Sequence, residues 1–165
     1  MLSFDITHRL TDLLIAIEAA THRHGPGLPA LTVVLATPRG GTPWLYTEPV
    51  PVPDHAWHAQ PGGTIGVLTT LAAALRCPAG TQLLARAYRA RPHDRVLAYV
   101  LTYQYQGWAG PVRMLDAVDT DQRLYRVSRA GWDGQVSLSV HDDPDPHDPP
   151  TRAALADLLA ATPTR

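Results

Sequence analysis

The chain has 165 residues, 45% of them hydrophobic, and its formal net charge is −1. This apolar content is enough for one core, and a charge so close to zero gives no bulk attraction to nucleic acid or to acidic membrane lipids. All 14 basic residues are arginine, which is typical of a high-GC genome and excludes a lysine-dependent Walker phosphate loop. The single Cys77 excludes an internal disulfide, and no run of about 18 apolar residues is present to span a bilayer. We therefore expect one cytoplasmic domain over residues 1–165, without a membrane partner.

The first half of the chain predicts two helices and a pair of strands. Residues 5–24 carry an apolar stripe at helical spacing, with Ser3 or Asp5 available as the N-terminal cap. Residues 31–37 and 44–47 favour strands around a turn, and the alternating prolines of 49–53 then indicate an extended connector, either a sheet edge or a loop. Gly62 and Gly63 open a second helix that reaches Leu75, with Thr64 as its expected cap, and residues 81–90 favour a further short helix.

Residues 94–140 predict a meander of four strands, over 96–106, 112–118, 123–129 and 135–140. Their short connections force antiparallel neighbours, because a parallel crossover needs a dozen or more residues. The strand over 96–106 is apolar on both faces, which is typical of a central strand. The last strand alternates, with Val136, Leu138 and Val140 on one face and polar residues on the other, so we expect that second face to be wet.

A polar, proline-rich linker at 141–150 precedes a last helix, for which Asp148 is the expected cap. The element order predicts an α+β fold, a largely antiparallel sheet covered by N-terminal, middle and C-terminal helices. This order resembles that of profilin-like and roadblock-like modules. The resemblance concerns element order alone, so it implies helices flanking an antiparallel sheet and nothing about activity.

Aromatic and arginine side chains give the first functional hypothesis, a surface for a protein partner or for self-association. Tryptophan and tyrosine bury a large area at a low entropy cost, so they favour interfaces. The alternatives are an ordinary wet sheet face with arginine stems covering apolar surface, a small-ligand pocket, or a nucleic-acid site, which the net charge disfavours. The candidate contact residues are Trp44, Tyr46, Trp57, Tyr103, Tyr105, Trp108, Arg113 and Arg126.

Histidine and aspartate side chains give the second hypothesis, a metal-dependent hydrolase or nuclease. Residues 141–148 hold four carboxylates and two imidazoles, which are ligands for divalent cations, and two further histidines at i and i+3 would share one face of a helix. The spacing matches neither a calcium loop nor a zinc signature, so a solvated linker is the alternative. The candidate ligands are His55, His58, His141, Asp143 and His147.

No nucleophile stands out in the sequence. Cys77 follows Arg76 at the end of a predicted helix, where the helix dipole disfavours a thiolate, and no serine has the Gly-x-Ser-x-Gly pattern. A non-enzymatic protein-binding or assembly module that requires no cofactor is therefore the preferred prediction, with the metal enzyme as its alternative.

Overall fold

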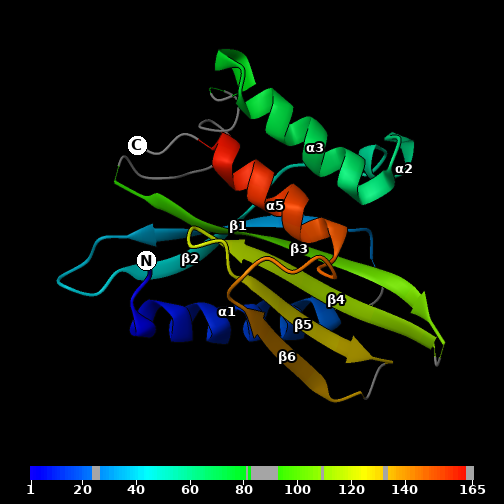
Figure 1. The fold of residues 1–165 in the computed structure, drawn as a ribbon, viewed down its shortest axis with the longest axis horizontal. Helices are drawn as coiled ribbons and strands as arrows, with labels where there is room; N and C mark the ends of the chain where they lie inside the picture. The colour runs from blue at the N-terminus through cyan, green and yellow to red at the C-terminus, as the bar shows by residue number, and fades with distance from the viewer. Residues whose placement is uncertain (24–26, 81, 83–92, 109, 132–133, 163–165) are drawn as a thin grey trace.

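The computed structural model contains the predicted meander, and a hairpin enlarges it to one antiparallel sheet (Figure 1). The structure describes residues 1–23, 27–80, 82, 93–108, 110–131 and 134–162. The strands are β1 (Ala30–Thr37), β2 (Trp44–Pro49), β3 (Arg95–Gly107), β4 (Gly110–Asp119), β5 (Leu124–Ala130) and β6 (Val136–His141). They form a six-stranded sheet in the order β2-β1-β3-β4-β5-β6, which confirms the predicted α+β fold class.

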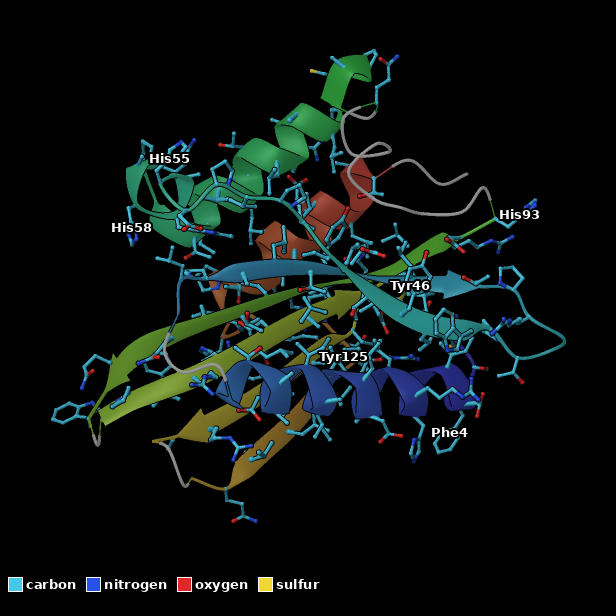
Figure 2. All side chains as sticks on the ribbon, turned by 180° about the vertical axis from the view of Figure 1, so that it is seen from behind. Phe4, Tyr46, His55, His58, His93 and Tyr125 are labelled. Atoms are coloured by element: carbon cyan, nitrogen blue, oxygen red, sulfur yellow. The ribbon has the colours of Figure 1, made fainter. Side chains whose placement is uncertain are left out.

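Helices cover both faces of this sheet. They are α1 (Phe4–Arg23), α2 (Ala56–Ala59), α3 (Gly63–Leu75) and α5 (Pro150–Ala161). α1 packs on one face, and α2, α3 and α5 lie on the other (Figures 1 and 2). Most of the short helix predicted over 81–90 lies outside the described residues. Among the helices of the described part of the chain, none is long and apolar enough to cross a membrane.

The strand β3 is central, as its two apolar faces predicted, because β1 and β4 flank it and helices cover both of its sides. Its residues divide between two cores, one on each face of the sheet. The core beneath α3 and α5 includes Leu31, Leu68, Tyr99, Leu101, Leu155 and Leu158. The core beneath α1 includes Leu10, Leu14, Val34, Val100, Leu115, Tyr125 and Val127.

A bulge near the start of β3 corrects the predicted alternation of its side chains. Strict alternation predicts that Leu97 faces the same way as Tyr99. In the structure the β1–β3 register shifts between Val34 and Leu35, and one residue of β3 is left over. As a result both Leu97 and Ala98 pack beneath α1, whereas Tyr99 packs beneath α3 and α5.

Two predicted helix caps are wrong. Gly62, with φ of +82°, occupies the N-cap of α3 in place of Thr64, and a left-handed conformation of this kind suits glycine. Pro149 occupies the N-cap of α5 in place of Asp148, whose carboxylate has a different partner. The cap of α1 is confirmed, since the Ile6 N–H donates to Ser3 Oγ at 3.4 Å.

Candidate functional site

Two of the predicted contact aromatics lie on the edge strand β2 (Figure 2). The rings of Trp44 and Tyr46 stack with centroids 5.3 Å apart, and the Arg39 guanidinium lies 5.8 Å from the Trp44 ring. The Tyr46 hydroxyl and the Thr37 hydroxyl both donate to the buried carboxylate of Asp94 at the start of β3. The hydroxyl of Tyr46 is therefore occupied within the fold, and only Trp44, which is 49% exposed, presents a large free surface here.

Trp57 does not join these two aromatics. It lies on the short helix α2, is buried in the core beneath α3 and α5, and is therefore a packing residue and no part of an exposed surface. The chain around it is rich in proline and glycine, which is why the sequence did not predict a helix there.

The other exposed aromatics lie at the end of the β3–β4 hairpin. Gly107 pairs with Gly110, so Trp108 lies at the hairpin tip, where it is fully exposed. Tyr105 is 50% exposed, and Leu28, in the segment after α1, is 40% exposed. An open hollow here is lined by Gly27, Leu28, Gln104, Tyr105 and Gln106. Among the described residues no charged side chain lines this hollow, so the chemistry of this lining is apolar contact plus amide hydrogen bonding.

The predicted arginine of β5 belongs to a buried network instead of an open surface. Arg126 stands directly opposite Asp116 on β4 and donates to both oxygens of its carboxylate, at 2.9 and 3.3 Å. The same carboxylate, which is fully buried, also accepts from the hydroxyls of Tyr103 and Thr151. Burial and the neighbouring carboxylate raise the pKa of Tyr103. The network joins three strands to the start of α5, and its polar atoms are satisfied within the fold.

A second pair of charges fixes α1 to the other face of the sheet. Glu18 is 1% exposed and makes a bidentate pair with Arg129 of β5, at 2.8 Å for both contacts. Arg113, a predicted contact residue, stands opposite Arg129 on β4 and is half-buried. The two arginines on this face are therefore next to the anchoring point of α1.

The turn between β4 and β5 contains a third buried carboxylate. Asp119 Oδ1 accepts from the backbone N–H groups of Asp121 and Arg123, at 2.8 and 3.0 Å, and these bonds hold the turn. Its other oxygen accepts from the Tyr125 hydroxyl at 2.8 Å. Burial raises the pKa of Asp119, and these hydrogen bonds offset the effect only in part.

The predicted metal segment at 141–148 does enclose a cation, but the cation is the guanidinium of Arg152. Arg152, on α5, is 5% exposed. It donates to the carbonyl of Asp143 at 2.8 Å, to the Asp148 carboxylate at 2.6 Å and to the carbonyl of Gln122 at 2.7 Å. The Asp145 N–H and Arg152 both lower the pKa of Asp148.

The predicted metal ligands therefore do not form one site. His141, Asp143 and His147 are exposed, and the Asp143 side chain makes no contact with Arg152, which uses the backbone carbonyl. His55 and His58 lie at α2, and both are exposed (Figure 2). Among the described residues, no group of three or more His, Cys, Asp or Glu side chains is placed to hold a metal ion.

The sequence analysis missed Glu18 and Arg152 as structural residues, although each carried a signal. Glu18 continues the row of Leu10 and Leu14 at a spacing of four residues, and Arg152 precedes Leu155 by three, so both charges fall on apolar stripes. Charged residues at such positions are rarely buried unless they are paired. Asp116 showed the same signal, as a single carboxylate inside an apolar strand.

Comparisons of the chain with models of protein families, with curated proteins and with solved structures found no match. The geometry of the chain itself is thus the basis for a functional proposal. In the described residues, no buried side-chain nitrogen or oxygen lacks a hydrogen-bond partner. The groups left open for a ligand are at the surface, and the aromatic end of the β3–β4 hairpin is the main concentration of them.

Proposed function

We propose that the chain is a non-enzymatic protein-binding or assembly module whose contact surface is the end of the β3–β4 hairpin. The observation that carries this proposal is the exposure of Trp108 and Tyr105 beside the hollow that Leu28 lines. Large aromatic side chains left in water at a hairpin tip cost free energy in the isolated chain, and a partner that covers them recovers it.

The lining of the hollow favours an uncharged peptide segment as the occupant. Gln104 and Gln106 are exposed, and a glutamine amide both donates to and accepts from a peptide backbone. Tyr105 and Leu28 provide apolar contact for a side chain of the partner. Since none of the described residues that line the hollow is charged, they offer no counter-charge to a phosphate or a metal ion. The metal-enzyme alternative gains no support from its ligands, which lie apart.

The test compares the double variant Y105A/W108A with the wild type and with F4A. Phe4 is 86% exposed on α1, away from the hairpin, and is therefore a matched control for loss of an exposed aromatic ring. Binding of a protein partner at the hairpin is measured by co-purification. We expect Y105A/W108A to weaken this binding by about tenfold or more, as loss of aromatic anchors does, and F4A to leave it unchanged. A wild-type chain that is monomeric and binds no protein, or equal binding in all three chains, would contradict the proposal.

A further inference from the structure

The two edges of the sheet differ in how they are protected. The edge strand β2 has Pro43 before it and Pro49 at its end, and further prolines follow within 49–53. Proline has no N–H to donate, so this edge resists pairing with another strand. The other edge strand, β6, contains no proline, and among the described strands it is hydrogen-bonded to β5 alone. Within 135–141 the only ionisable side chain is that of His141. The backbone of β6 is therefore open to a further strand (Figure 1).

The sequence of β6 is self-complementary. Residues 136–140 read Val-Ser-Leu-Ser-Val, which is the same in both directions. When two copies of such a strand pair antiparallel about Leu138, valine lies opposite valine, serine opposite serine and leucine opposite leucine. Residues directly opposite each other in an antiparallel pair point to the same face of the sheet. The valines and leucines of both copies therefore share one face, and the serines share the other. His141 falls opposite Gln135 of the second copy, so no like charges oppose each other within this stretch.

The burial of the β6 side chains suits the same pairing. Val136 and Leu138 pack against the core beneath α1, whereas Val140, on the same face, is 44% exposed. In the pairing about Leu138, Val140 lies opposite Val136 of the second copy, where apolar contact removes it from water. On the other face Ser137 is exposed and lies opposite Ser139 of the second copy, whose hydroxyl is hydrogen-bonded to His141 Nε2 of its own strand at 3.1 Å.

We propose that β6 pairs antiparallel with β6 of a second copy of the chain, centred on Leu138, and joins two sheets into one. Because the prolines beside β2 disfavour strand pairing at the opposite edge, no third copy is added there. The product is a two-fold dimer instead of a fibre. The proposal rests on the proposed function in taking the chain as an assembly module, but it uses a surface other than Tyr105 and Trp108. The paired strands are short, so the dimer is weak and depends on concentration.

Site-directed cross-linking tests the register of this dimer. The exposed Cys77 is first replaced in a C77S chain, and single cysteines are then introduced as S137C and as S139C. In the proposed register residue 137 faces residue 139 of the second copy, at a Cα separation of about 4.5–5.5 Å that allows a disulfide. Residue 137 lies about 7–8 Å from its own counterpart, which is the diagonal spacing. We therefore expect severalfold more disulfide dimer in a mixture of the two chains than in either chain alone.

A charge placed on the apolar face tests the same contact without a cross-link. V140K puts an ammonium opposite Val136 of the second copy, and we expect it to raise the dissociation constant by about tenfold. I15K is the matched control, because Ile15 is 38% exposed and lies on α1, outside the edge strand β6. Circular dichroism of both variants checks that the fold is kept.

The outcomes separate this dimer from the proposed function. A wild-type chain that stays monomeric up to about 1 mM, where weak interfaces still associate, overturns the dimer. So does equal cross-linking in the mixture and in the single chains, or a dimer that V140K leaves intact. If Y105A/W108A leaves partner binding unchanged while V140K abolishes self-association, the hairpin surface is overturned and the dimer stands. If partner binding persists in a monomeric chain, only the dimer is lost.

Discussion

At the scale of single residues, the interior of this protein contains more charge than its sequence suggests. Glu18, Asp116 and Asp119 are each 1% exposed or less. An isolated buried carboxylate is costly, and each of the three is compensated by an arginine or by several hydrogen bonds. The compensation is uneven, because the pKa of Asp119 is raised by burial. The contribution of Asp119 to the stability of the fold must therefore depend on pH.

The unfolding free energy of the variant D119N should increase relative to that of the wild type as pH rises from about 4 to 7. At low pH, Asp119 is protonated in both the folded and the unfolded chain. As pH rises past the ordinary value of 3.8, the unfolded chain ionises first, because the pKa of the folded carboxyl is raised. The wild type therefore loses stability over this range, and an asparagine at position 119 does not.

Chemical denaturation of D119N and wild type at several pH values measures this difference. A difference in unfolding free energy between D119N and wild type that stays constant with pH would show that Asp119 ionises in the folded chain as it does in water.

At the scale of elements, the segment 141–148 has a composition that predicts a metal site and a structure that binds an arginine side chain. Its acidic residues and histidines predicted a divalent cation, but its backbone carbonyls and Asp148 surround the guanidinium of Arg152. An arginine supplies several donors in a fixed plane, and backbone carbonyls are acceptors that no composition reveals. The segment is thus a fixed connection between β6 and α5.

R152A should destabilise the chain by about 2–4 kcal/mol, because the carbonyls of Gln122 and Asp143 lose a buried donor. Thermal and denaturant unfolding measure this loss. R76A is the matched control, since Arg76 pairs with Asp157 at the surface with both side chains about half exposed, and it should change stability little. Equal effects of R152A and R76A would mean that the segment does not depend on Arg152.

The elements that the sequence predicted correctly are those with a strong period. The helix α1 and the four strands of the meander were predicted to within a few residues, because their apolar stripes or alternations are long. The short helix α2 and the bulge at Leu97 were not, since each depends on contacts between distant segments. Trp57 is buried in the core because it lies on α2, so its burial was not predicted either.

The candidate site was predicted less well than the fold. Side-chain type identified exposed aromatics at Trp108 and Tyr105, but it also grouped them with Trp57 and Arg126, which have partners inside the fold. Whether a side chain faces water or a counter-charge is decided by strand pairing. For example, Arg126 is matched to Asp116 only because β4 and β5 align them.

At the scale of the whole molecule, the sheet has one protected edge at β2 and one open edge at β6. Its centre is β3, which is covered by helices on both faces. Because of this asymmetry, the proposed pairing with a second copy extends the sheet at β6. The aromatic end of the β3–β4 hairpin lies outside that edge and remains available to another protein.

Amide hydrogen exchange at low and at high protein concentration is the most direct test of this architecture. We expect the amides of residues 97–102 in β3 to be strongly protected at both concentrations, because β3 lies between two paired strands and two helical layers. We expect the amides of β6 that point away from β5 to gain protection only at high concentration, where a second copy pairs with them. Weak protection of β3 would contradict the sheet order, and exchange in β6 that does not change with concentration would contradict the open-edge dimer.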